Sequence, residues 1–167
     1  MPPNQMPAEA GPRNPGVHFP PPFLYLLGLG IAWILETKVT RIRLAGASVS
    51  TTPLEMAGCG IMLAGFVLML WGLLTFARVR TGIIPMRPAT QIVTHGPYRF
   101  SRNPMYTGMG LAYLGGSLMM NSGWALIMLP LVMLGIYRLV IKREERYLDS
   151  AFPTEYGEYK KSVRRWL

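Results

Sequence analysis

The sequence predicts an all-α membrane protein with about four transmembrane helices, a cytoplasmic loop and a C-terminal helical tail. Half of the 167 residues are hydrophobic and 15% are charged, whereas about a quarter of the residues of a soluble domain are charged. The apolar residues are gathered into runs long enough to cross a bilayer. The 17 Lys and Arg residues outnumber the 8 Asp and Glu residues, which favours anionic lipid headgroups as partners. Nucleic acid is not a predicted partner, because the sequence has no motif that binds it.

We expect a flexible tail over residues 1–22, which contain eight prolines, followed by a single transmembrane domain over residues 23–167. Proline on this scale prevents a helix and favours an extended chain. Cys59 is the single cysteine, so neither a disulfide nor a cysteine metal site can form within one chain. The twelve methionines lie mostly in the apolar runs and are interpreted as packing residues. We therefore predict no metal site.

The first two predicted spans are residues 23–35, which are few for a span, and residues 54–77. The polar connection between them ends at Thr52-Pro53, which predicts a helix start with Thr52 as N-cap and Pro53 at the first helical position. Three glycines near the start of the second span predict a small-residue face for close helix packing: Gly58, Gly60 and Gly65.

The third and fourth predicted spans are residues 105–121 and 124–141. The turn residues Asn121-Ser122-Gly123 join them, so they should form an antiparallel hairpin. The fourth helix is expected to continue past the membrane through residues 142–149, because its pattern stops only at Phe152-Pro153. A short amphipathic helix is predicted over residues 155–165.

The distribution of arginine predicts the orientation. Residues 78–104 contain five Arg and no acidic residue, so this loop should be cytoplasmic. Four spans then bring both termini to the cytoplasmic side. Three basic residues would lie on the opposite side against this rule: Lys38, Arg41 and Arg43.

The least generic stretch of the chain is residues 95–106, His-Gly-Pro-Tyr-Arg-Phe-Ser-Arg-Asn-Pro-Met-Tyr. Gly96-Pro97 interrupts any helix, and Asn103-Pro104 predicts a helix start with Asn103 as N-cap. The free N–H groups of that start carry partial positive charge and suit a ligand with acceptor groups. The plainer interpretation is a basic loop that only orients the protein.

A second stretch supports the functional interpretation. Glu144-Glu145 is followed by Phe152-x-x-x-Tyr156-x-x-Tyr159-Lys160-Lys161. The two stretches together resemble the isoprenylcysteine carboxyl methyltransferases and their relatives, the membrane phospholipid N-methyltransferases. In that family the first stretch reads Gly-x-Tyr-x-x-x-Arg-His-Pro-x-Tyr-x-Gly, and the second has paired acids, an aromatic residue and Tyr-x-x-Tyr-Lys-Lys. The resemblance covers about residues 88–165.

This resemblance implies an S-adenosylmethionine-dependent methyltransferase with S-adenosylhomocysteine as product, whose cofactor site is formed by the loop and the C-terminal tail on the cytoplasmic side. It implies thirteen cofactor-binding residues: Thr90, Gln91, Ile92, Val93, His95, Gly96, Tyr98, Arg102, Asn103, Pro104, Tyr106, Glu144 and Glu145. Asn103 stands where the carboxyl methyltransferases have His, and an Asn side chain cannot titrate near neutral pH. Asn103 and Arg138 are the candidate catalytic residues. Arg138, near the end of the fourth span, either contacts substrate or extends to the membrane interface.

The chemistry of the cofactor agrees with these residues. Its carboxylate suits Arg or a helix N-terminus, its ammonium suits Glu144 or Glu145, and Tyr98 or Tyr106 can cover the adenine or the sulfonium. Taken alone, the paired acids would indicate a solvated helix end. The acceptor is expected to be a lipophilic carboxylate or amine from the bilayer. The alternative function is a catalytically silent membrane scaffold or subunit.

Overall fold

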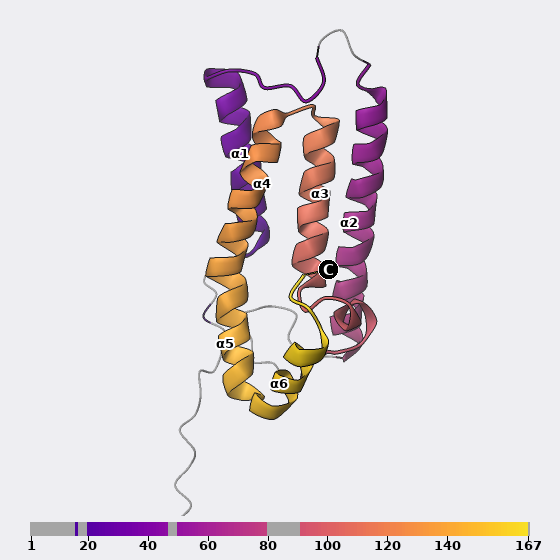
Figure 1. Ribbon diagram of the computed structural model, residues 1–167, viewed down its shortest axis with the longest axis vertical. Helices are drawn as coiled ribbons and strands as arrows, with labels where there is room; N and C mark the ends of the chain where they lie inside the picture. The colour runs from indigo at the N-terminus through magenta and orange to yellow at the C-terminus, as the bar shows by residue number, and fades with distance from the viewer. Residues whose placement is uncertain (1–15, 17–19, 47–49, 80–90, 167) are drawn as a thin grey trace, which may run out of the picture.

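The structure is a computed structural model that describes residue 16 and residues 20–46, 50–79 and 91–166. All regular secondary structure within these residues is helical. Figure 1 labels six α-helices: α1 (Pro22–Lys38), α2 (Thr52–Val79), α3 (Pro104–Met119), α4 (Gly123–Ile136), α5 (Lys142–Ala151) and α6 (Pro153–Ser162). A 3-10 helix, η1 (Gly96–Arg99), precedes α3, and a π-helix, η2 (Tyr137–Ile141), joins α4 to α5. The predicted all-α class is confirmed for the described residues.

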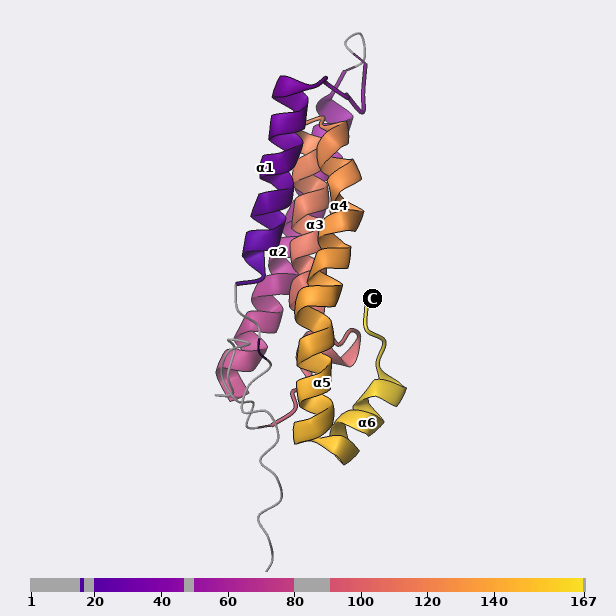
Figure 2. The same ribbon diagram turned by 90° about the vertical axis from the view of Figure 1, so that its left-hand side faces the viewer.

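Helices α1 to α4 lie side by side as a bundle, and α5 and α6 extend beyond one end of it (Figures 1 and 2). Helix α3 packs against α2, α4 and α1, and α1 packs against α4. Helices α4, η2 and α5 continue into one another from Gly123 to Ala151, as predicted for the fourth helix. Phe152, with φ −138° and ψ 62°, leaves the helical conformation, and Pro153 begins α6.

The packing of α2 on α3 depends on glycines at seven-residue intervals. Gly58 and Gly65 of α2 face Gly115 and Gly108 of α3, and a Cβ on Gly65 would lie 2.5 Å from the Gly108 carbonyl oxygen. Backbones approach this closely only where side chains are absent. The predicted small-residue face is confirmed at Gly58 and Gly65. It is wrong at Gly60, where a Cβ would meet no atom within 4 Å.

The predicted N-cap of the second span is displaced by one residue. Helix α2 begins at Thr52 itself, so Thr51 is the residue that precedes it. The Thr51 hydroxyl donates to Glu55 Oε1 at 2.6 Å, and its carbonyl accepts from the Glu55 N–H at 2.9 Å. Thr51 therefore takes the N-cap position predicted for Thr52, and its side chain bonds to the Glu55 carboxylate.

The turn between α3 and α4 is fixed at the far end of the bundle by polar side chains. Asn121 has a positive φ of 49°, and its Oδ1 accepts from the N–H groups of Leu44 and Ala45 at 2.9 and 2.8 Å. Ser122 caps α4 and donates to Glu36 Oε2 of α1 at 2.8 Å. The predicted hairpin is confirmed, and its turn is bonded to α1 and to the connection that follows α1.

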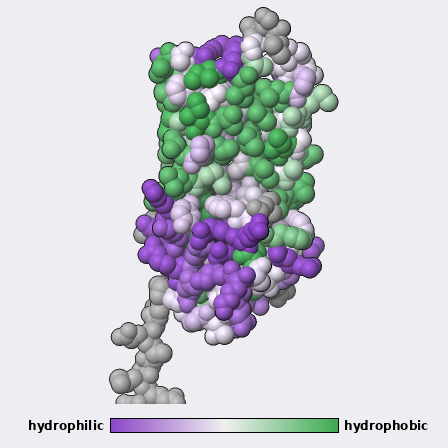
Figure 3. All heavy atoms as spheres, viewed as in Figure 1, coloured by the Kyte–Doolittle hydropathy of each residue, from purple (hydrophilic) through white to green (hydrophobic). Residues whose placement is uncertain are grey.

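The surface changes character along the bundle. On the face shown in Figure 3, hydrophobic residues cover the bundle and hydrophilic residues gather at the end that carries α5 and α6. Two helices are long and apolar enough to cross a membrane, judged by length and composition: Thr52–Arg78 and Gly123–Ala151. The other two predicted spans correspond to shorter helices, α1 with 17 residues and α3 with 16.

Candidate functional site

Several of the predicted site residues lie where α5 and α6 leave the bundle. The loop over residues 91–103 packs on α6 through a small core of Val93, Tyr98, Tyr156 and Tyr159. Because α3 and α4 run in opposite directions, the first turn of α3 lies beside the start of α5. The site is therefore built from one loop and two helix ends.

Tyr106 and Glu144 meet at the centre of this region. The hydroxyl of Tyr106, a buried residue in the first turn of α3, donates a 2.8 Å hydrogen bond to Oε1 of Glu144 on α5. Tyr25 of α1 donates from its own hydroxyl to the Tyr106 carbonyl oxygen at 2.9 Å. Three helices are thus joined here, as the antiparallel hairpin predicts for Tyr106 and Glu144.

Glu144 lies in α5, beyond the apolar part of the fourth helix, and is half-buried. Burial raises the pKa of its carboxyl group to about 7; the Tyr106 hydrogen bond lowers this pKa, and the Glu145 carboxylate raises it. Within the described part of the chain, no Lys or Arg forms an ion pair with Glu144. A carboxylate in this environment is suited to a cationic ligand.

Glu145 has a different environment, although it is the neighbouring residue. Arg165 holds it with two hydrogen bonds of 2.9 Å, from Nε to Oε1 and from Nη2 to Oε2. Arg102 Nη1 lies 3.1 Å from the same Oε1. The structure thus places Glu145 in an ion-pair cluster, whereas Glu144 has no cationic partner among the described residues.

Tyr98 forms a wall on the loop side. It is buried, and its ring lies edge-on to the Phe76 ring with 5.0 Å between centroids. Burial raises the pKa of Tyr98 above its ordinary value, as do nearby Tyr159 and Glu144. The Tyr159 hydroxyl donates to the Tyr98 carbonyl at 2.7 Å. The sharp turn before Tyr98 requires Gly96, whose φ is +62°.

The start of α3 differs in one respect from the prediction. Asn103 occupies the N-cap position and Pro104 follows in the first turn, but the Asn103 side chain makes no capping hydrogen bond. Its Nδ2 instead donates to the Arg165 carbonyl at 3.1 Å. The predicted capping role of the side chain is therefore wrong, and the amide joins the loop to the C-terminal segment.

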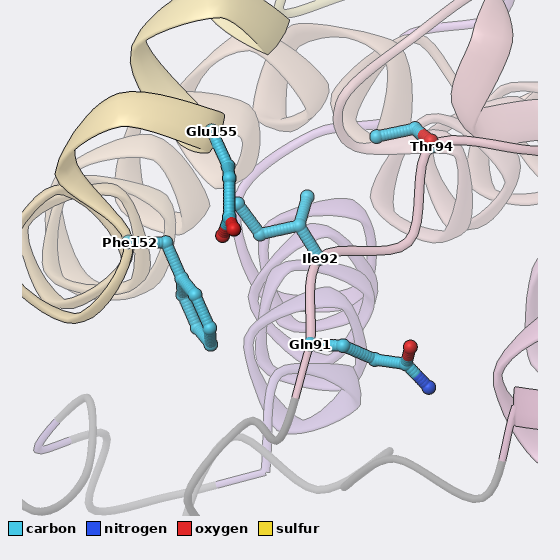
Figure 4. A pocket seen from close by; sticks show the side chains of 5 residues that line it. All are labelled: Gln91, Ile92, Thr94, Phe152 and Glu155. Atoms are coloured by element: carbon cyan, nitrogen blue, oxygen red, sulfur yellow. The ribbon is translucent and has the colours of Figure 1, made fainter.

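Two further predicted residues line an open pocket of about 320 Å³ between the loop and α6. Its lining residues are Gln91, Ile92, Thr94, Phe152 and Glu155. Figure 4 shows the Glu155 carboxyl group beside Ile92, with Phe152 on the same side and Gln91 extending away from them. Neither Phe152 nor Glu155 was predicted as a site residue.

The remaining predicted residues lie outside this group. His95 is exposed, and Arg138 is exposed on η2. Thr90 falls outside the described residues. Two features of this region were not predicted: the π-helix η2, a geometry often found at functional sites, and the contacts of Arg165. Neither carries a local sequence signal.

Comparison with known proteins gives the family. A family model described as phospholipid methyltransferase matches residues 54–155. The match begins well before residue 88, where the motif resemblance starts, and includes α2.

Three individual relatives match between 38% and 66% of the chain. It is 40% identical over 73 residues to the cobalt-zinc-cadmium resistance protein CzcN of Cupriavidus metallidurans, which is 44% of this chain and 33% of that protein. It is 40% identical over 63 residues to an uncharacterized protein of Haemophilus influenzae, 38% of this chain and 100% of that protein. A probable protein-S-isoprenylcysteine O-methyltransferase of Oryza sativa is 29% identical over 112 residues, 66% of this chain and 59% of that protein.

The chain therefore spans less than two thirds of the CzcN and rice proteins. No solved structure gives a significant match. The family model covers more than half of the chain, including the stretch over residues 95–106 and both Tyr106 and Glu144. The chain belongs to the phospholipid methyltransferase family.

Proposed function

We propose that this chain is an integral membrane methyltransferase that uses S-adenosylmethionine and acts on a lipophilic acceptor from the bilayer. The observation that carries the proposal is Glu144, a half-buried acid that accepts a hydrogen bond from Tyr106. In the described residues it has no cationic partner. Family membership supports the reaction class, and this acid supports a ligand with a positive charge.

The residues of the site fit the cofactor group by group. Glu144 would hold the α-ammonium through a charge-assisted hydrogen bond. The free N–H groups at the start of α3 would hold the carboxylate, because Arg102 is already paired with Glu145. Tyr98 and Tyr106 would flank the bound molecule and exclude water from it. When bound, the cofactor supplies an electrophilic methyl group on its sulfonium sulfur.

Contacts at both ends of the bundle support four membrane spans. Helix α1 is bonded at one end through Tyr25 to Tyr106 and at the other through Glu36 to Ser122. It therefore runs the length of α3, although each helix is only about 25 Å long at 1.5 Å per residue. The short turn after α3 likewise makes α4 run back alongside α3. If α2 and the long fourth helix cross the bilayer, α1 and α3 cross with them.

The site then opens on the cytoplasmic side, at the hydrophilic end that carries α5 and α6. The acceptor is a lipophilic carboxylate like that of isoprenylcysteine or an amine like that of a phospholipid. A carboxylate is ready to accept a methyl group at neutral pH, whereas an amine must first lose a proton. Asn103 has no titratable group for that purpose. We propose that Arg138, which is exposed on η2, meets the acceptor at the membrane surface.

Transfer of a labelled methyl group from S-adenosylmethionine tests the proposal. The purified protein is placed in nanodiscs that contain either phosphatidylethanolamine or an added isoprenylcysteine analogue. A carboxylate acceptor gives a methyl ester that base hydrolyses, and an amine acceptor gives a base-stable product. Cofactor binding without transfer to either acceptor would favour the alternative, a silent scaffold that keeps the fold.

Cofactor affinity should depend on pH through Glu144. Its pKa of about 7 leaves the carboxyl mostly protonated at pH 6 and mostly ionised at pH 7.5, and only the ionised form pairs with the ammonium. We expect S-adenosylmethionine to bind about five- to tenfold more tightly at pH 7.5 than at pH 6. Above about pH 8 the α-amino group of the ligand loses its own proton, and affinity should fall again. Calorimetric titrations across this range measure the profile.

Replacing Tyr106 by Phe should weaken cofactor binding modestly. The change removes one hydrogen bond to Glu144, worth about 0.5–1.5 kcal/mol, and keeps the ring. Because that bond lowers the Glu144 pKa, the midpoint of the pH profile should also move up. Tyr98→Ala should cost more affinity, since it removes a buried wall. Equal affinities for wild type and both variants would place the cofactor elsewhere.

A further inference from the structure

Arg165 joins three elements of the site. Its guanidinium makes the two 2.9 Å hydrogen bonds to Glu145 of α5 and lies over the Tyr137 ring of η2, 5.0 Å from the centroid. Its carbonyl oxygen accepts from Asn103 Nδ2 at 3.1 Å and from Ser101 Oγ at 3.2 Å. One residue near the end of the described chain thus contacts α5, η2 and the loop before α3.

Arg102 strengthens the same connection. Its N–H donates to the Arg164 carbonyl at 2.9 Å, and its Nη1 lies 3.1 Å from Glu145 Oε1. The side chains of Arg102 and Glu145 are only 11% and 14% exposed. Ion pairs at this depth are screened less than surface pairs, and removal of one partner leaves a charge uncompensated.

We propose that Arg165 is a positioning residue that holds the loop over residues 101–103 against α5 and thereby keeps Tyr106 at Glu144. Asn103 lies three residues before Tyr106, and Glu145 follows Glu144 directly, so Arg165 holds a close neighbour of each partner. Its main chain contacts the loop and its side chain contacts the helix. The part of this inference that concerns the cofactor rests on the proposed function.

The ion pairs of Glu145 also affect the ionisation of Glu144. The groups around its carboxyl are Tyr106 of α3, Tyr98 of the loop and Glu145 of its own helix, and the cations next to Glu145 are Arg102 and Arg165. The Glu145 carboxylate disfavours ionisation of Glu144, and its cations offset that effect. Loss of Arg165 should therefore raise the pH at which the cofactor binds, and loss of the Glu145 charge should lower it.

The test compares Arg165→Ala and Arg165→Lys with a matched control, Arg164→Ala. Arg164 is exposed, and alanine keeps its carbonyl while removing the same net charge. We expect Arg165→Ala to weaken S-adenosylmethionine binding about tenfold at pH 7.5 because the pocket is misaligned. Arg165→Lys keeps the charge without the paired hydrogen bonds, so its loss should be intermediate. Arg164→Ala should stay within about twofold of wild type, because exposed charges contribute little.

The pH midpoint separates positioning from a merely structural contribution. Arg165→Ala should move it up, Glu145→Gln should move it down, and Arg164→Ala should leave it in place. A contact that only stabilises the fold would weaken binding without these opposite shifts.

Hydrogen–deuterium exchange measures how well the loop is held in the absence of the cofactor. Arg165→Ala and Arg165→Lys should raise exchange over residues 96–106, and Arg164→Ala should not. If the wild type binds no cofactor but exchange rises only in the Arg165 variants, the proposed function fails and the positioning role stands. If exchange, affinity and midpoint are the same in the Arg165 variants as in Arg164→Ala, the positioning role is overturned.

Discussion

Replacing Glu144 by Gln is expected to weaken binding of S-adenosylmethionine about 10- to 150-fold at pH 7.5. The change keeps the shape of the side chain and removes the charge that pairs with the ammonium, a charged hydrogen bond worth about 1.5–3 kcal/mol. The pH dependence below neutrality should disappear with it, because Gln does not titrate. Calorimetry or equilibrium dialysis with the purified protein measures both effects.

The matched control is Glu145→Gln, one residue away. Glu145 is bonded to Arg102 and Arg165, so its loss should act through the position of the loop and cost less affinity than the loss of Glu144. Equal losses in the two variants would remove the distinction between a binding acid and a positioning acid. If neither variant loses affinity for the cofactor, both acids belong to a solvated helix end and neither binds it.

Gly65→Ala is expected to lower the stability of the helix bundle by about 1–3 kcal/mol, the usual cost of overpacking. A Cβ at this position would lie 2.5 Å from the Gly108 carbonyl and 2.6 Å from the Ala112 nitrogen. Both are backbone atoms, so α2 and α3 must move apart. The midpoint of unfolding in mixed detergent micelles measures the loss.

Gly60→Ala is the control for this prediction. It lies on the same helix, where a Cβ would meet nothing within 4 Å, so the higher helix propensity of Ala should stabilise by about 0.5–1 kcal/mol. If both substitutions stabilise the protein, the close contact between α2 and α3 does not exist in the membrane.

The long helices were predictable because their signals are local. The apolar runs, the Asn121-Ser122-Gly123 turn and the break at Phe152-Pro153 each depend on a few neighbouring residues. The error at Gly60 has a simple cause: residues two apart lie on nearly opposite sides of a helix, so Gly58 and Gly60 cannot share one face. The displaced N-cap at Thr52 reflects two adjacent threonines with equal capping chemistry.

The site was less predictable because its contacts are distant in the sequence. Glu144 and Glu145 differ by one step of a helix, about 100° of rotation, and periodicity does not reveal the π-helix η2, which changes the rotation of everything after it. One of the two cations paired with Glu145, Arg165, lies twenty residues later in the sequence. Asn103 was placed correctly at the start of α3, yet its amide bonds to that same distant residue.

A calorimetric titration of S-adenosylmethionine into the purified wild-type protein measures whether the Glu144 site binds the cofactor. We expect saturable binding to one site at pH 7.5, weakened about five- to tenfold at pH 6 as Glu144 gains its proton. Absence of saturable binding at either pH, or an affinity that is the same at both, would contradict it.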